Sequence, residues 1–191
     1  MIMLHGRNAG PHNILELADL LPNPGFTFLA PAAAGNTWYP FSFMAETERN
    51  EPGLSSALLV VDGLVGEIEA KGIPRRRIIL LGFSQGACLA AEYAVRHASR
   101  FGALIVLSGG LIGPPGTRWD YPDSFAGCPV FLGCSDVDAH VPRERVHESA
   151  LVFERMAAKV TERIYPGMGH QVSEEELILV RGLMTEVAAA S

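Results

Sequence analysis

Short apolar runs alternate along the chain with stretches whose apolar positions recur at helical spacing. The runs are rich in Ile, Val, Leu and Phe and seldom alternate with polar residues, which is typical of strands buried on both faces of a parallel sheet. They predict strands at residues 2–4, 26–30, 78–83, 103–107, 129–132 and 162–165. The periodic stretches predict helices near residues 12–21, 54–71, 85–97, 143–159 and 173–189.

This alternation of strands and helices predicts a three-layer α/β fold, a small version with about six mainly parallel strands and helices on both faces of the sheet. We see no repeat, low-complexity stretch or linker that divides the chain, so we expect residues 1–191 to form one domain. In such sheets the chemistry lies in loops that leave the carboxyl ends of strands. Candidate residues should therefore follow predicted strands.

Two connections, residues 31–53 and 109–127, are long for a compact α/β domain. Both contain aromatic residues rather than the polar composition of a flexible tether: Trp38, Tyr39, Phe41, Phe43, Trp119 and Tyr121. We therefore expect them to pack as a rim over a pocket.

The residues 82–86, Gly-Phe-Ser-Gln-Gly, match the G-x-S-x-G pattern between a predicted strand and a predicted helix. A serine at the tip of such a sharp turn adopts a strained backbone, which is tolerable when the residues two positions away lack side chains. The turn also directs the helix N-terminus at developing negative charge. We interpret Ser84 as a candidate nucleophile, and the alternative is an inert tight turn.

A serine hydroxyl needs a base, and six histidines are available. His170 follows the last predicted strand in the glycine-rich stretch YPGMGH, and it suits the chain order serine, acid, histidine. His140, between Asp138 and Pro142, is the alternative. The remaining histidines lie in the first loop or in helical patterns: His5, His12, His97 and His147.

The acid that orients the base is expected after the strand at 129–132, where Asp136 and Asp138 both occur. We prefer Asp138 and keep Asp136 as a rival. Either could instead be a capping carboxylate for the helix that begins near Arg143.

Backbone amides should stabilise the oxyanion of a tetrahedral intermediate. The amide of Gln85, directly after the serine, is one expected donor. The second should follow the first strand, in the stretch HGRNAG, where Gly6 and Gly10 allow close approach of the backbone and Arg7 offers its N–H. An ordinary glycine turn is the alternative reading of this stretch.

Composition narrows the classes of function. A net charge of −6 favours neither nucleic acid nor an anionic membrane as partner. The start lacks a signal-peptide pattern, and no apolar run approaches the ~20 residues that span a bilayer. We expect three buried free thiols in a reducing cytoplasm: Cys88, Cys128 and Cys134. Cys128 and Cys134 would lie roughly 20 Å apart along one predicted strand, which is too far for a disulfide.

The chain resembles the phospholipase/carboxylesterase family of α/β-hydrolases, which includes the acyl-protein thioesterases, in four motifs that occur in the family's order: HGR, GFSQG, DAHVP and GMGH. The stretch GNTWYP is similar to the bacterial members of this family. The resemblance implies Ser84 as nucleophile, His170 as base, Asp138 as acid, and the amides of Arg7 and Gln85 as oxyanion hole.

The chain also departs from the family pattern. Asn8 stands where the family's HGRGG form has a glycine, which puts the conformation of this loop in question. The chain begins nearly at the HG motif, so it is either a minimal version of the family or starts late.

The expected function is hydrolysis of carboxylic esters, with thioesters as an open variant, through a Ser-Asp-His triad and an acyl-enzyme. We expect a small or medium soluble ester as substrate. We expect no cofactor, no metal, no nucleic acid and no integral membrane association. A homodimer is left open. Five apolar loop residues could bind the acyl group, with the protein core as the alternative place for each: Trp38, Tyr39, Phe41, Leu111 and Met168.

Two other classes of function stay open at this point. One is a non-catalytic protein that binds a ligand on a hydrolase scaffold. The other is an enzyme similar to dienelactone hydrolases with a cysteine nucleophile, for which Cys88, one helical turn after Ser84, is the residue at hand.

Overall fold

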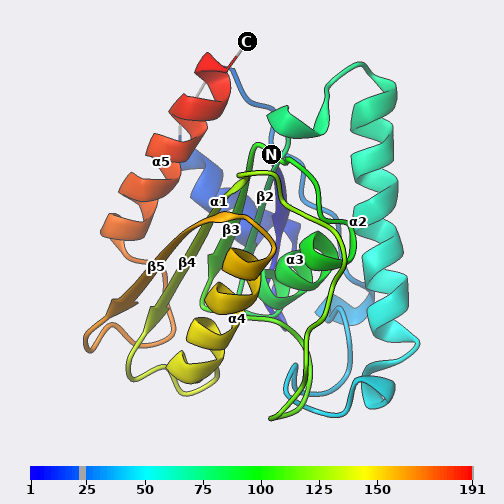
Figure 1. Cartoon of the computed structure of the whole chain (residues 1–191), viewed down its shortest axis with the longest axis vertical. Helices are drawn as coiled ribbons and strands as arrows, with labels where there is room; N and C mark the ends of the chain where they lie inside the picture. The colour runs from blue at the N-terminus through cyan, green and yellow to red at the C-terminus, as the bar shows by residue number, and fades with distance from the viewer. Residues whose placement is uncertain (22–24, 191) are drawn as a thin grey trace.

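The computed structural model describes residues 1–21 and 25–190, in which five parallel strands form one sheet of order β1-β2-β3-β4-β5 (Figure 1). The strands are β1 (Ile2–Leu4), β2 (Ile79–Phe83), β3 (Ala103–Leu107), β4 (Pro129–Ser135) and β5 (Lys159–Tyr165). The register of the last pair runs from Pro129 opposite Lys159 to Ser135 opposite Tyr165. Parallel pairing throughout confirms the fold class, because all carboxyl ends share one edge of the sheet.

The helices form the two outer layers. They are α1 (Pro11–Asp19), α2 (Gly53–Ala70), α3 (Gln85–Arg96), α4 (Arg143–Arg155) and α5 (Glu174–Ala189). Helices α1 and α5 share one buried apolar cluster with the sheet, and α2, α3 and α4 share the other (Figure 1). The fourth helix ends four residues earlier than its predicted limit of residue 159, because Ala157 takes a left-handed conformation (φ 58°) and the chain turns into β5.

The predicted strand at residues 26–30 does not form, so the described sheet has five strands rather than six. Among the described residues, this segment pairs with the sheet at a single bridge between Leu29 and Ile2. The Met3 amide donates to the Leu29 carbonyl oxygen at 2.8 Å. The ladder cannot continue past residue 30, because Pro31 has no amide hydrogen to donate.

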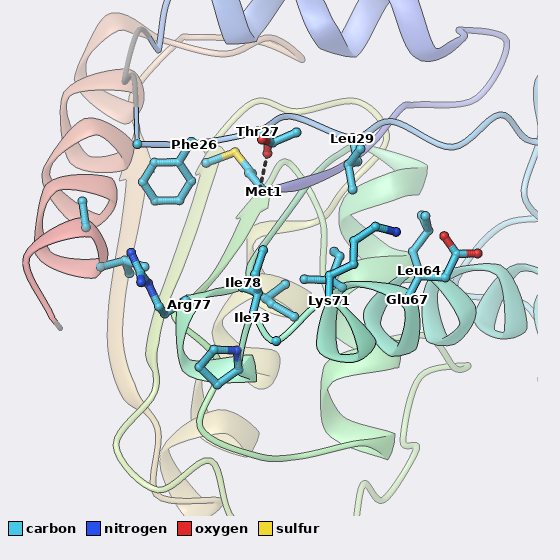
Figure 2. A pocket seen from close by; sticks show the side chains of 16 residues that line it. Met1, Phe26, Thr27, Leu29, Leu64, Glu67, Lys71, Ile73, Arg77 and Ile78 are labelled. Atoms are coloured by element: carbon cyan, nitrogen blue, oxygen red, sulfur yellow. Dashed lines mark hydrogen bonds between the residues drawn. The ribbon is translucent and has the colours of Figure 1, made fainter.

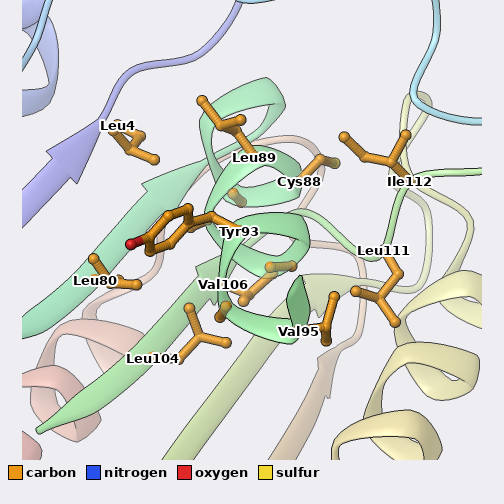
Figure 3. Packing of buried hydrophobic residues seen from close by; sticks show 14 of the residues in the cluster. Leu4, Leu80, Cys88, Leu89, Tyr93, Val95, Leu104, Val106, Leu111 and Ile112 are labelled. Carbon is orange, nitrogen blue, oxygen red and sulfur yellow. The ribbon is translucent and has the colours of Figure 1, made fainter. Parts of the chain in front are cut away.

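The face of the sheet under α3 holds the larger apolar cluster (Figure 3). Side chains of β1, β2 and β3 face those of α3, among them Leu4, Leu80, Leu104, Val106, Leu89 and Tyr93. Small residues bring this helix close to the strands: Ala87, Ala90, Ala91 and Ala94 are fully buried. This close packing of α3 against the strands holds the N-terminus of α3 directly after the end of β2.

Candidate active site

The turn between β2 and α3 holds Ser84 in a conformation that residues other than glycine rarely adopt, with φ 55° and ψ −120°. The two glycines of the motif make room for it. A Cβ atom on Gly86 would lie 2.1 Å from the Leu4 carbonyl oxygen, and one on Gly82 would lie 2.2 Å from the Gly86 carbonyl oxygen. Backbone approaches backbone so closely at both positions that only glycine fits.

Ser84, His170 and Asp138 form one hydrogen-bonded chain, although they come from three connections. Oγ of Ser84 lies 2.9 Å from Nε2 of His170, and Nδ1 of His170 lies 2.7 Å from Oδ2 of Asp138. The three residues meet because β2, β4 and β5 end at the same edge of the sheet. An imidazole between a hydroxyl and a carboxylate can accept the hydroxyl proton while the carboxylate orients the ring and stabilises its charge.

The Asp138 carboxylate is fully buried and held from several sides. Its Oδ1 accepts the amides of His140 at 2.8 Å and Val141 at 3.0 Å. Burial disfavours its charge, but the hydrogen bonds from His170 and from the two amides outweigh that effect and lower the pKa of Asp138. The group is therefore an ionised acceptor for the imidazole at neutral pH.

Asp136, the rival acid, lies in the same loop with a different partner. Its Oδ1 accepts the amide of Gly167 at 2.8 Å. The hydroxyl of the adjacent Ser135 accepts the amide of Gly169 at 3.0 Å. Both contacts tie the loop that carries His170 to the end of β4, so Asp136 supports the position of His170 from a distance.

No other described histidine makes a hydrogen bond with the serine hydroxyl, although His140 lines the same cleft as Ser84. His140, the alternative base, packs edge-on against the His170 ring with the centroids 4.7 Å apart. His5 is buried, and both of its ring nitrogens lie within hydrogen-bond distance of loop backbone. The rest lie on or at the end of helices α1, α3 and α4: His12, His97 and His147.

Arg7 and Gln85 line the same cleft as Ser84, and neither backbone N–H has an acceptor among residues 1–21 and 25–190. Gln85 is the first residue of α3, where the helix end carries partial positive charge. Asn8 has φ 61°, the left-handed region that glycine favours and asparagine tolerates, and its amide donates to the Asn36 carbonyl oxygen at 2.8 Å. The loop thus takes a conformation that suits a glycine, with asparagine in its place.

A cleft of ≈ 510 Å³ opens over Ser84. Its apolar walls come from the connection at 31–53 and from the loops after β2 and β4, and include Tyr39, Phe41, Phe43, Phe83 and Val141. Two of the five expected substrate-binding residues, Tyr39 and Phe41, line this cleft. The first long connection therefore forms part of the rim, as its aromatic content predicts.

The other three expected substrate-binding residues are elsewhere. Trp38 is 4% exposed, and its indole N–H donates to the His5 carbonyl oxygen at 2.9 Å. Leu111 is fully buried under α4, and Met168, in the turn before His170, does not line the cleft. The second long connection, residues 109–127, does not line the cleft over Ser84, because its buried apolar residues pack into the core cluster around α3 and α4. Its residues 116–119 instead line a separate pocket of ≈ 290 Å³ beside α4.

Sequence reasoning missed two residues that line the cleft over Ser84. One is Phe83, whose ring centroid lies 5.0 Å from that of His170. The other is Val141. Phe83 and Val141 occur within the GFSQG and DAHVP motifs, so their position beside two triad candidates is a signal that could have found them.

A second cavity of ≈ 470 Å³ lies at the opposite edge of the sheet (Figure 2). It borders residues just before β1 and β2, such as Met1 and Ile78, and the C-terminal ends of α2 and α5. Figure 2 shows Phe26, Leu29 and Ile73 around it. Its described lining has no serine, histidine or cysteine, whereas the cleft over Ser84 holds the hydrogen-bonded pair Ser84 and His170.

Cys88 lines the cleft but is only 1% exposed, and burial raises the pKa of its thiol to about 12. It is therefore a protonated thiol at neutral pH, unsuited as a nucleophile. In the described part of the chain, all three cysteines are free and buried, and no group of three or more His, Cys, Asp or Glu side chains is placed to hold a metal ion. None of the described helices is both long and apolar enough to cross a membrane.

Known proteins are similar to this chain over much of its length. The chain is 33% identical over 158 residues to acyl-protein thioesterase 1 of Eremothecium gossypii, a match that covers 78% of the chain and 63% of the relative. Matches to the thioesterases of Gibberella zeae and Kluyveromyces lactis cover 57% and 56% of those proteins. The chain thus spans less than two thirds of the length of these curated relatives.

A crystal structure of a phospholipase/carboxylesterase from Dyadobacter fermentans is 43% identical and superposes with a TM-score of 0.92 over 96% of this chain and 88% of the other. Esterase PE8, at 23% identity and a TM-score of 0.81, shares the fold. The family model described as phospholipase/carboxylesterase matches residues 1–185. The chain therefore belongs to the phospholipase/carboxylesterase family.

Proposed function

We propose that this protein is a serine hydrolase that cleaves carboxylic esters or thioesters of small to medium soluble substrates. The observation that carries the proposal is the hydrogen-bonded chain from Ser84 through His170 to Asp138 at the floor of an open cleft. Membership of a family with thioesterase and carboxylesterase relatives supports it.

Each step follows from the positions of the groups. Nε2 of His170 takes the Ser84 proton as Oγ attacks the carbonyl carbon, and the oxyanion accepts hydrogen bonds from the amides of Arg7 and Gln85. The imidazolium then protonates the leaving alcohol or thiol. Water, deprotonated by the same imidazole, hydrolyses the acyl-enzyme and regenerates the hydroxyl. Asp138 keeps its charge throughout and stabilises the imidazolium.

The cleft supports a modest acyl group. Its ≈ 510 Å³ is within the range of small-ligand sites, and aromatic side chains form much of the wall. The guanidinium of Arg7 donates to three backbone carbonyls of the cleft wall, so these N–H groups point at the protein rather than at an acyl chain. We therefore expect neutral acyl groups of short to medium length.

Replacement of the nucleophile tests the proposal. Ser84→Ala should lower kcat for p-nitrophenyl esters by at least about 10⁴-fold, because the covalent step is lost. In the wild-type protein, a fluorophosphonate probe should label Ser84, as mapped by peptide mass spectrometry. Ser55→Ala, at an exposed site on α2, is the matched control and should keep full activity. Undiminished hydrolysis by Ser84→Ala would overturn the proposal.

A further inference from the structure

The two residues whose amides border the proposed oxyanion site also hold one wall of the cleft through their side chains. Residues 37–41, which we call the cleft segment, lie against both Arg7 and Gln85. This segment carries Tyr39 and Phe41, which line the cleft. In both Arg7 and Gln85, the backbone N–H is the proposed oxyanion donor, and the side chain holds the neighbouring wall of the cleft.

Gln85 binds the first half of the segment. Its side chain is 6% exposed, and Oε1 accepts the Trp38 amide at 3.0 Å and the Thr37 hydroxyl at 3.2 Å. Nε2 donates to the Tyr39 carbonyl oxygen at 2.8 Å. A buried amide satisfied at both ends fixes the backbone that it bridges, since breaking either contact leaves a polar group without a partner.

Arg7 binds the second half. Nη2 donates to the carbonyl oxygens of Tyr39 at 3.0 Å and Phe41 at 2.7 Å, and Nη1 donates to that of Pro40 at 2.8 Å. Three successive carbonyls turned toward one guanidinium set the path of the chain. The Tyr39 carbonyl receives donors from both Arg7 and Gln85, so the two side chains converge on a single peptide group.

Other contacts hold the segment in the fold without these side chains. The Trp38 indole packs on the buried His5 ring, with centroids 4.8 Å apart. The Phe41 amide donates to Oδ1 of the fully buried Asn50 at 2.8 Å. Loss of the Gln85 contacts should therefore shift the wall locally while the segment stays attached at both ends.

We propose that the Gln85 and Arg7 side chains are positioning residues that set the distance between the oxyanion hole and the Tyr39–Phe41 wall, and thereby select the length of the acyl group. This inference rests on the proposed function. A butyryl group extends two carbons beyond an acetyl group, so its fit depends more on the position of the wall. Disturbing the wall should therefore penalise longer acyl groups more than acetate.

The test compares Gln85→Met and Arg7→Lys with the wild-type protein on p-nitrophenyl acetate and butyrate. Both variants keep the backbone N–H, and methionine nearly matches the volume of glutamine. The butyrate-to-acetate ratio of kcat/KM should fall by about five- to tenfold in Gln85→Met, as the loss of a net hydrogen bond or two predicts. Arg7→Lys keeps the charge but cannot reach all three carbonyls, and should shift the ratio in the same direction.

Two controls separate positioning from a general structural role. Thr37→Ser keeps the hydroxyl that donates to Gln85 and should retain the wild-type ratio. Val65→Ala removes core volume on α2, away from the cleft, and should lower Tm while the ratio stays the same. A ratio within about twofold of wild type in Gln85→Met, with both esters slowed alike, would overturn the inference.

A readout independent of catalysis keeps the two proposals distinct. Hydrogen exchange at the Trp38 amide should be slow in the wild-type protein and clearly faster in Gln85→Met, because Oε1 is its acceptor. If the wild-type protein hydrolyses no ester but this difference is present, the proposed function fails and the positioning contact stands. Unchanged exchange in Gln85→Met would reject the positioning role whatever the activity.

Discussion

At the scale of single residues, the carboxylates of Asp136 and Asp138 bind different partners although they are two positions apart. Oδ2 of Asp138 faces His170, whereas Oδ1 of Asp136 accepts the Gly167 amide. The first contact acts on the imidazole itself, and the second places the loop that carries it. Chemically identical groups thus differ only in where the loop after β4 directs them.

The pKa of Asp138 predicts how stability depends on pH. Burial opposes its charge, but the bonds from His170 and the loop amides lower its pKa below the ordinary 3.8. A lowered pKa in the folded state adds stability that is present above the unfolded value and is lost as pH falls through the folded value. The stability advantage of the wild-type protein over Asp138→Asn should therefore be full near pH 7 and shrink below about pH 4.

Urea unfolding of both proteins from about pH 7 to about pH 3 measures this difference directly. Taking the difference at each pH removes the general effect of acid on other groups. A gap that stays constant over the whole range would show that the carboxylate charge adds nothing to folding.

At the scale of elements, the β2–α3 unit depends on glycines that permit backbone contact. A Cβ atom at Gly82 or Gly86 would lie 2.2 Å or 2.1 Å from a backbone carbonyl oxygen, which is too close for any side chain to fit. Glycines on the outer helix α2 differ, since a Cβ at Gly63 would meet nothing within 4 Å. The same residue type therefore has opposite consequences in the two elements.

Alanine substitutions should reveal this contrast. Gly86→Ala should destabilise the protein by about 3 kcal/mol or more, because the clash is with backbone and no side chain can move to relieve it. Gly63→Ala, the matched control in an exposed helix, should stabilise it by about 0.5–1 kcal/mol. Unfolding in urea gives both values, and a similar effect at the two sites would contradict the assignment of close backbone packing.

At the scale of the whole molecule, the two long connections meet at one buried cation. Arg145 of α4 is 1% exposed and donates through Nη1 to the carbonyl oxygens of Leu111 at 2.9 Å and Gly113 at 2.7 Å. Its guanidinium also lies over the rings of Phe43 and Trp119, 5.8 Å and 4.9 Å from their centroids. One side chain thus links the wall of the cleft to the segment packed behind it.

Removal of this cation should loosen both connections together. Arg145→Met leaves two buried carbonyls without their donor, at about 1–3 kcal/mol each, so we expect a loss of about 2–6 kcal/mol in the free energy of unfolding. Arg143→Met, at an exposed position of the same helix, should change it by less than about 0.5 kcal/mol. Equal effects of the two substitutions would show that the buried contacts of Arg145 contribute little.

Much of the fold could be predicted because its signals are local. Apolar runs predict buried parallel strands within a few residues of those observed, and the G-x-S-x-G turn has a steric reason contained in five residues. The edge segment at 26–30 shows the limit of such signals. Its composition is that of a strand, yet strand pairing depends on a neighbour that the local sequence does not specify.

Hydrophobic period and chain order can be seen in the amino-acid sequence, and they suffice to predict the parallel α/β architecture and the order of the candidate residues after strands. The three-dimensional structure was needed to show that Asp138 meets His170, 32 residues away, that Trp38 turns into the core, and that the Gln85 side chain holds a segment 46–48 residues distant. Contacts across such separations depend on how loops fold back over the sheet edge, and that path follows from the packing of the whole chain.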